Sequence, residues 1–309
     1  MTTQTIITHV GTSTLATLHA IPACGGFVRR LETTFATGDP PDTDVVRSVT
    51  DLIAERDRIW NRWSGTTAQD RRKRRQALPA ELASLSLLNL HATDQVVLLH
   101  SQTPDGRFCA RVLAGLLTRE GATVQDFPTC AKERLKLVEV QGLRAASDHT
   151  STTQITTAET FVREGLVYYV HEVWKIYHEA NRGDKLVFNV TGGYKGMIPI
   201  ARDVAMLLAA AHRSENPDFV CELCYLYEES SELIIYGSLP MTFTFERLLK
   251  DDLTKAALPH GTPAATSHLK EHPEWRPYFE AVPHQPQYHQ RTALGEVMLA
   301  LYAKLKPTW

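Results

Sequence analysis

The sequence has few cysteines and no long apolar segment. Both features limit the classes of protein to which the chain can belong. Its 309 residues include five cysteines, an odd number scattered along the chain. Scattered cysteines do not predict a disulfide framework, so we expect a reducing, cytoplasmic environment. No apolar run reaches 18 residues, and the first five residues lack the positive charge of a secretory signal. We therefore expect no membrane-spanning helix and no membrane partner.

An excess of charge of one sign is also missing. The chain has 33 lysines and arginines against 35 aspartates and glutamates, for a formal net charge of -2. Proteins that bind long nucleic acids usually carry a basic excess, so we do not expect such a partner. A small anionic ligand held in one local pocket is compatible with this balance.

Apolar runs of strand length alternate with segments of helical periodicity. Strands are expected at 5–10, 95–100, 123–127 and 185–190, and helices at 44–91, 108–119, 158–180 and 198–212. Two further runs, 219–227 and 233–236, predict a closing hairpin. This alternation predicts an α/β fold with a mostly parallel sheet, helices on both faces and an antiparallel edge.

The composition changes after Pro240. Six prolines lie between positions 259 and 286, and a helical pattern returns only at 292–305. We place a domain boundary near residue 240. The α/β domain then spans 1–240, with a helical insertion at about 44–91, and residues 241–309 form a small, mainly helical region that acts as a lid or a dimerisation arm.

Three turns rich in small and hydroxyl residues follow predicted strands. They are Gly-Thr-Ser-Thr at 11–14, Ser-Gln-Thr-Pro-Asp-Gly at 101–106 and Asn-Val-Thr-Gly-Gly-Tyr-Lys-Gly at 189–196. The carboxyl ends of parallel strands meet at one edge of a sheet, and helix N-termini at that edge bind phosphate. Each turn can equally be a tight turn or a helix cap without a ligand. The dinucleotide fingerprint and the Walker A loop are both missing.

Taken together, the three turns resemble those of the CARF family of CRISPR-associated proteins. The resemblance covers roughly residues 4–240, and the turn at 189–196 is its most specific part; residues 161–166 and 238–240 also fit the pattern. It implies a Rossmann-like domain that forms a homodimer. It also implies that a cyclic oligoadenylate, most often the tetra-adenylate, binds on the dimer two-fold axis.

The resemblance further implies roles for individual residues. Ser13 and Lys195 match the catalytic pair of the family's ring nucleases, which need no metal or cofactor and leave linear products with a 2′,3′-cyclic phosphate. The residues implied to contact the ligand are Gly11, Thr12, Ser101, Thr103, Asp105, Gly106, Thr191, Gly192, Gly193 and Tyr194. The alternatives are a non-catalytic sensor or effector regulator of the same family and an ordinary nucleotide-binding α/β enzyme.

Other conspicuous residues are interpreted as structural. His9 lies within a predicted strand, and we expect a core histidine rather than an acid or base. The basic run 71–75 is expected to be a solvated helix face, with contact to RNA or a cyclic phosphate as the alternative. Cys221 and Cys224 would point to opposite faces of their strand, which argues against a shared metal.

Overall fold

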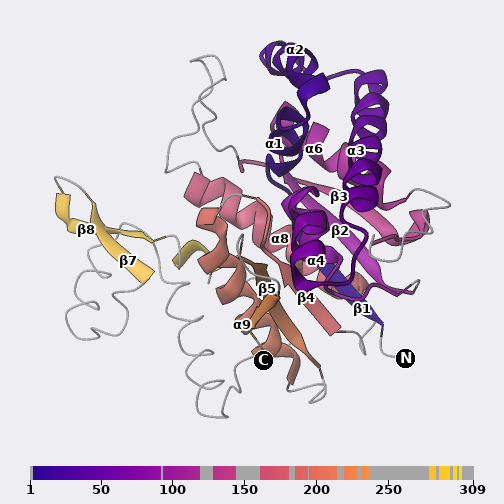
Figure 1. Cartoon of the computed structure of the whole chain (residues 1–309). Helices are drawn as coiled ribbons and strands as arrows, with labels where there is room; N and C mark the ends of the chain where they lie inside the picture. The colour runs from indigo at the N-terminus through magenta and orange to yellow at the C-terminus, as the bar shows by residue number, and fades with distance from the viewer. Residues whose placement is uncertain are drawn as a thin grey trace.

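A six-stranded sheet forms the centre of the protein in the computed structural model (Figure 1). The structure describes residues 3–91, 93–118, 128–143, 161–180, 185–193, 195–213, 219–227, 232–236, 278–282, 285–292, 295–297 and 299–300. The strands are β1 (Gln4–His9), β2 (Gln95–Ser101), β3 (Leu135–Val140), β4 (Lys185–Asn189), β5 (Cys221–Leu226) and β6 (Leu233–Tyr236). Their order in the sheet is β3-β2-β1-β4-β5-β6.

The order of the strands creates a switch point at β1. From β1 the chain builds outward to β2 and β3 on one side, and then returns to add β4 and β5 on the other side. All these neighbours pair in parallel, whereas β5 and β6 pair antiparallel. In such sheets the crevice for a ligand lies outside the carboxyl ends of the strands at the switch point, which here means β1, β2 and β4.

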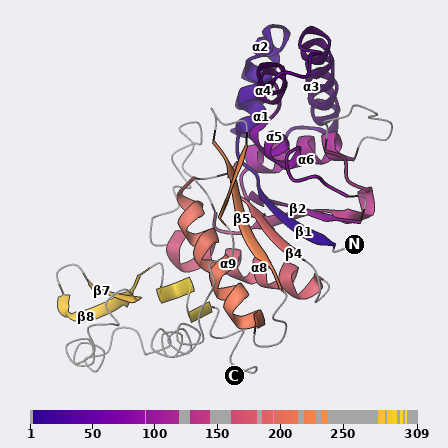
Figure 2. The same cartoon turned by 60° about the horizontal axis from the view of Figure 1, so that its bottom comes forward.

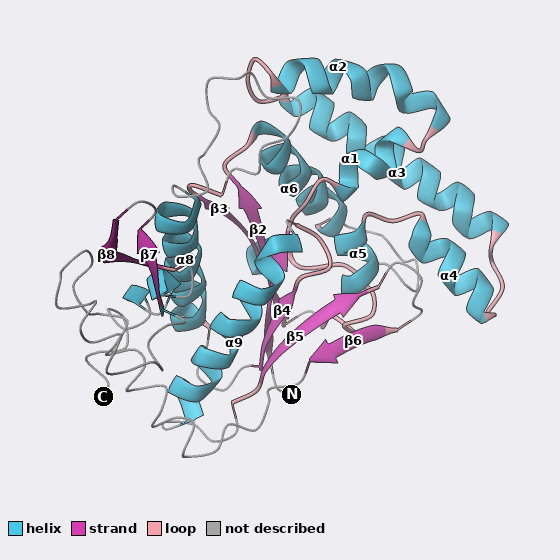
Figure 3. Ribbon diagram, turned by 90° about the vertical axis from the view of Figure 1, so that its left-hand side faces the viewer, coloured by secondary structure: helices cyan, strands magenta, loops and turns pink. Residues whose placement is uncertain are grey.

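Helices cover both faces of the sheet, which is Rossmann-like as predicted (Figure 3). They are α1 (Ser13–His19), α2 (Gly25–Phe35), α3 (Asp42–Arg62), α4 (Ala68–Gln76), α5 (Ala80–Leu85), α6 (Pro104–Leu117), α8 (Leu166–Glu179) and α9 (Ile198–Arg213). The core residues of α1, α2, α3, α5 and α6 form one buried cluster, and those of α8 and α9 form the other. Helices α2 and α3 extend beyond the sheet (Figure 2).

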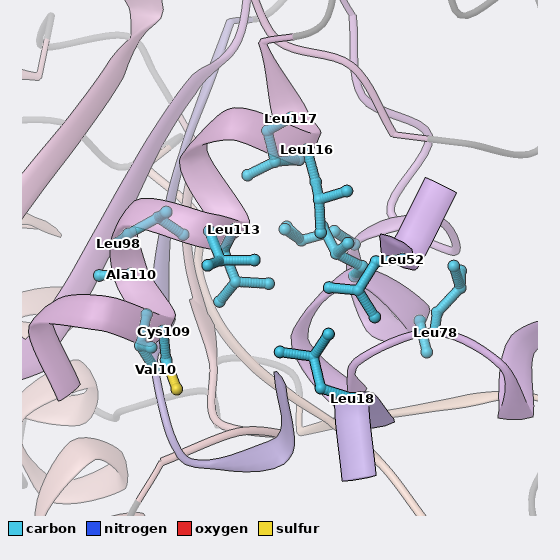
Figure 4. Close-up of a cluster of buried hydrophobic side chains, with 14 of the residues drawn as sticks. Val10, Leu18, Leu52, Leu78, Leu98, Cys109, Ala110, Leu113, Leu116 and Leu117 are labelled. Atoms are coloured by element: carbon cyan, nitrogen blue, oxygen red, sulfur yellow. The ribbon is translucent and has the colours of Figure 1, made fainter. Parts of the chain in front are cut away.

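Each strand contributes to both clusters because its side chains alternate between the faces of the sheet. Ile6 belongs to the cluster under α6, and Ile7 belongs to the cluster under α8 and α9. Cys221 and Cys224 are divided between the clusters in the same way, as the sequence predicted. Figure 4 shows part of the first cluster, in which Leu98 of β2 meets Leu113 of α6.

Most predicted elements are confirmed, and the differences are local. The helical stretch at 44–91 is divided among α3, α4 and α5, and a π-helical turn at Phe161–Gly165 precedes α8. The strand expected at 123–127 lies outside the described residues. Strand β3 was not predicted, because Lys136 and Glu139 interrupt its apolar pattern.

The described part of the tail contains a hairpin that the sequence did not predict, and the expected mainly helical character of residues 241–309 stays a prediction. The described residues of the tail include an antiparallel hairpin of β7 (Phe279–Val282) and β8 (Gln285–Arg291), followed by helical residues at 295–297 and 299–300. Tyr278, Phe279 and Val297 join the core cluster under α8 and α9. The boundary near 240 stays a prediction, because it falls outside the described residues. No helix in the described ranges has the length and apolarity to cross a bilayer.

A matched pair of leucine substitutions tests this core. Leu98 is fully buried on β2, whereas Leu137, its partner in the register on β3, is 42% exposed. We expect Leu98→Ala to lower the free energy of unfolding by about 2–5 kcal/mol, because the variant loses buried area and leaves a cavity. Leu137→Ala should cost less than about 1 kcal/mol. Urea denaturation measures both values, and equal losses would contradict the assigned burial.

Candidate functional site

A cavity of about 500 Å³ lies at the switch point of the sheet. All three predicted turns contribute to its lining: the turn after β1, the turn from β2 into α6 and the turn after β4. The predicted site residues that line it are Gly11, Thr12, Ser101, Thr103, Asp105, Gly106, Gly193 and Lys195. We call it the switch-point cavity.

The rest of the lining is largely apolar and aromatic. Val10, Leu99, Leu143, Phe161, Tyr169 and Met197 contribute, together with His9 and His100. Apolar walls with a few convergent polar groups are typical of sites for small organic ligands. A flat aromatic group with polar substituents, such as a nucleobase, suits this lining.

The turns after β1 and β4 touch each other through glycines. A Cβ atom at Gly11 would lie 2.5 Å from the backbone nitrogen of Gly193. Gly193 itself has a φ of +79°, and a Cβ there would lie 2.9 Å from the Cβ of His9. Both positions therefore require glycine, for close approach at Gly11 and for approach and backbone conformation at Gly193.

The buried carboxylate of Glu81 contacts both of these turns. Glu81, in the first turn of α5, is fully buried. Its Oε1 accepts a hydrogen bond of 2.8 Å from the backbone N–H of Gly11, and its Oε2 accepts one from the hydroxyl of Ser13. The carboxylate also packs against Gly192, where a Cβ would overlap it. Glu81 thus contacts the first and third turns at once.

A second buried polar group ties the third turn to α5. Asn189, the last residue of β4, donates a hydrogen bond of 2.8 Å from its side chain to Ser84 Oγ. The backbone N–H of Thr191 donates to Asn189 Oδ1 over 3.4 Å. Thr191 Oγ1 in turn accepts from the backbone N–H of Leu226 on β5 over 2.9 Å. The third turn is therefore fixed to both α5 and the sheet.

The turn after β2 is organised by Thr103, which caps α6. Its Oγ1 accepts from the backbone N–H of Gly106 over 3.2 Å and lies 2.8 Å from Ser101 Oγ. Arg107 donates to the backbone carbonyl of Gln102 over 2.8 Å. This arrangement places Asp105, in the first turn of α6, at the wall of the switch-point cavity.

Burial lowers the pKa of both histidines of the cavity. Burial lowers the pKa of His9 to about 4, and its Nε2 lies 3.1 Å from the hydroxyl of Tyr169. Burial also lowers the pKa of His100, whose Nδ1 lies 2.9 Å from the carbonyl of Ser101. His9 is buried as predicted, and it additionally lines the cavity.

The structure separates some of the predicted site residues. Lys195 lines the switch-point cavity, whereas Ser13 and Thr191 line a second cavity that has no lining residue in common with it. The hydroxyl of Ser13 is bound by Glu81 and also accepts a hydrogen bond of 3.1 Å from the backbone N–H of Ala80. Tyr194 lies outside the described residues.

The three turn motifs do not identify Glu81 as a site residue, although the sequence contains one signal for it. It is the only charged residue between positions 76 and 90, in a stretch rich in alanine and leucine. A lone charge in such a stretch is expected to be bound by specific partners when it is buried.

The fold and the cavity together define an α/β protein with a cavity at the switch point of its sheet. A family model described as "CRISPR-associated protein (Cas_APE2256)" matches residues 76–241, which is more than half of the chain. The chain belongs to this CRISPR-associated family. The matched region includes Glu81, the turn of Thr103 and the turn of Lys195. No curated protein matches the chain.

The buried carboxylate predicts a specific pH dependence of stability. Burial raises the pKa of Glu81 above its usual value of 4.5, and the hydrogen bonds from Ser13 and Gly11 oppose this effect. The folded state therefore holds the proton more tightly than the unfolded state. The contribution of Glu81 to the free energy of unfolding is complete below pH 4.5 and is lost as the pH rises through the pKa of the folded state. The free energy of unfolding then falls by no more than about 1.4 kcal/mol per pH unit.

Glu81→Gln removes this titration and retains the shape of the side chain. Urea denaturation between about pH 4.5 and 8 should show that the stability advantage of the wild type over the variant shrinks as the pH rises. Glu133→Gln, at an exposed position, is the matched control for loss of a carboxylate. A difference between wild type and Glu81→Gln that stays constant over this range would contradict the prediction.

Proposed function

We propose that the chain is a CARF-type ring nuclease that binds a cyclic oligoadenylate in the switch-point cavity. The observation that carries this proposal is the convergence of three turns and Lys195 on one cavity with apolar and aromatic walls. Adenine bases suit those walls, and phosphates suit the ammonium group and the backbone N–H groups of the turns. Membership of a CRISPR-associated family supports the same setting.

The size of the cavity favours a shared site. At about 500 Å³ it is in the range of pockets that hold a single drug-sized molecule. A ring of four adenylates is considerably larger than such a molecule. Two copies of the chain, related by a two-fold axis, would each hold half of the ring, which is why we propose a homodimer with cyclic tetra-adenylate as the favoured ligand.

The proposed reaction is an internal transfer of a phosphodiester. The 2′-oxygen of a ribose attacks the adjacent phosphorus and loses its proton, and the bond from phosphorus to the 5′-oxygen breaks. The leaving oxygen takes up a proton, and the product is a linear chain that ends in a 2′,3′-cyclic phosphate. The protein must hold the attacking and leaving oxygens in line and stabilise the charge on the phosphoryl oxygens.

Lys195 and Ser13 have different parts in this proposal. Lys195 lines the cavity and is assigned to stabilising the phosphoryl oxygens. The hydroxyl of Ser13 is bound to Glu81 behind the turn. We therefore assign Ser13 to positioning: together with Glu81 it holds the turn whose backbone faces the ligand.

Substitution of Lys195 should slow cleavage. We expect Lys195→Ala to lower the rate at least about tenfold, because the transition state loses a charge-stabilising donor. Cyclic tetra-adenylate is incubated with purified protein in EDTA, and linear products are separated by chromatography. Lys132→Ala, which removes an exposed lysine of a 3₁₀ turn, is the matched control. An unchanged rate in Lys195→Ala would exclude the role assigned to it.

Substitution of Ser13 should have the smaller effect. A positioning hydroxyl affects the rate only through the turn that it holds, so Ser13→Ala should slow cleavage less than Lys195→Ala does in the same assay. A greater loss in Ser13→Ala would reverse this ranking and assign Ser13 to the reacting atoms.

The hydrogen bond from the Ser13 hydroxyl to Glu81 also favours a second candidate function. In this alternative the protein is a sensor that binds the ring without cleaving it. Calorimetry together with chromatography of the recovered ligand separates the two candidates. Tight binding with the ring intact after prolonged incubation supports the sensor, and linear products support the nuclease. Absence of binding contradicts both.

A further inference from the structure

A second cavity of about 640 Å³ lies beside the basic helix α4. Residues of α1, α3, α4 and α5 line it, together with Thr191 and Leu226. Helix α4 lies next to α5, which covers the end of β5 (Figure 3). We call it the α4 cavity. It has no lining residue in common with the switch-point cavity.

Three basic side chains of α4 line this cavity: Arg72, Lys73 and Arg75. The other two residues of the basic run do not line it. Arg71 donates a hydrogen bond to the carbonyl of Thr66, and the guanidinium of Arg74 lies 5.9 Å from the centre of the Trp60 ring. The basic run therefore has two sets of side chains, of which one lines the cavity.

The acidic groups near the cavity are already bound. Asp70, the only acidic residue of α4, forms the capping box of the helix with Thr67. Glu55, which lines the cavity from α3, is bound by Arg58 through a hydrogen bond of 2.8 Å. Neighbouring like charges on a helix repel each other, so this arrangement favours binding of an anion at the cavity.

Apolar and aromatic groups form the rest of the lining. Ile59 contributes from α3, Trp63 from the C-cap position directly after α3, and Ile21 from the turn after α1. An aromatic ring beside several cations is the combination that proteins use for nucleotides: the ring stacks on a base, while Arg and Lys bind the phosphate. A solvated helix face, which we expected for this run, requires neither a cavity nor an aromatic group.

We propose that the α4 cavity binds a nucleotide through its base and its phosphate. Arg72, Lys73 and Arg75 contact the phosphate, and the base packs against Trp63 and Ile59. This site is separate from the switch-point cavity, so the proposal does not depend on the function proposed above. Ser13 and Thr191 nevertheless line the α4 cavity. A ligand in the α4 cavity would therefore contact two of the turns that also line the switch-point cavity.

Two double variants of the same helix test this proposal. The probe is linear di-adenylate with a 5′-phosphate, and its binding to the full chain is measured by calorimetry. Arg72→Gln/Lys73→Gln should raise the Kd at least about tenfold, because two charge-assisted contacts are lost. The matched control, Arg71→Gln/Arg74→Gln, removes the same charge from the same helix outside the cavity, and its Kd should stay within about threefold of the wild type.

Competition with the ring distinguishes the α4 cavity from the switch-point cavity. The ring used is cyclic tetra-adenylate with methylated 2′-hydroxyls, because it lacks the attacking group and yields no linear product that could compete. Binding of the probe should persist at saturating concentrations of this ring, whereas complete displacement by it would place the probe in the switch-point cavity and overturn the proposal. Equal losses in both double variants would show only general attraction to a basic helix and would also overturn it. If the ring itself does not bind, the function proposed above fails, while the two double variants still decide the α4 site.

Competitors define the chemistry of the ligand. Adenosine without a phosphate should compete at least about tenfold more weakly than the probe, because the charged contacts are absent. Inorganic phosphate should also compete more weakly, because it makes no contact with Trp63. Equal competition by inorganic phosphate would overturn the assignment to a nucleotide, and so would a wild type that does not bind the probe.

Discussion

The arrangement of the switch point depends on one buried carboxylate. A charge in the interior is costly unless hydrogen bonds replace the water that it loses. Glu81 obtains these bonds from the backbone of Gly11 and the hydroxyl of Ser13, and it packs against Gly192. Because both donors belong to the turn after β1, the conformation of that turn is coupled to the position of α5. The contact with Gly192 extends the coupling to the turn after β4.

The two turns that Glu81 contacts line both cavities. The turns that it supports present Thr12 and Gly193 to the switch-point cavity, and Ser13 and Thr191 to the α4 cavity. Nearby residues of each turn therefore line different cavities. Close packing between the two turns, through Gly11 and Gly193, leaves little space for independent movement of either turn. This is the structural basis on which occupancy of one cavity would affect the other.

The sequence was sufficient to predict the general fold and the edge of the sheet at which the switch-point cavity lies. Regular apolar runs identify β1, β2 and β4, and the turns after them meet because parallel strands have a common carboxyl edge. Contacts between distant segments could not be predicted. Strand β3 was missed because its pairing with β2, rather than its own pattern, establishes it. Glu81 is separated from Ser13 by 68 positions, and no local spacing connects the two.

The hydrogen-bonding capacity of Ser13 limits what it can do at the site. A hydroxyl has one proton to donate, and that of Ser13 is directed to Glu81 while its oxygen accepts from Ala80. Phosphate oxygens accept hydrogen bonds, so contact with one requires the proton to leave Glu81. Withdrawing a donor from a buried carboxylate costs at least about 1–3 kcal/mol, unless the carboxylate is protonated. Lys195 lines the switch-point cavity itself, which is why the proposal assigns the stabilisation of phosphoryl charge to Lys195 and the positioning of the turn to Ser13.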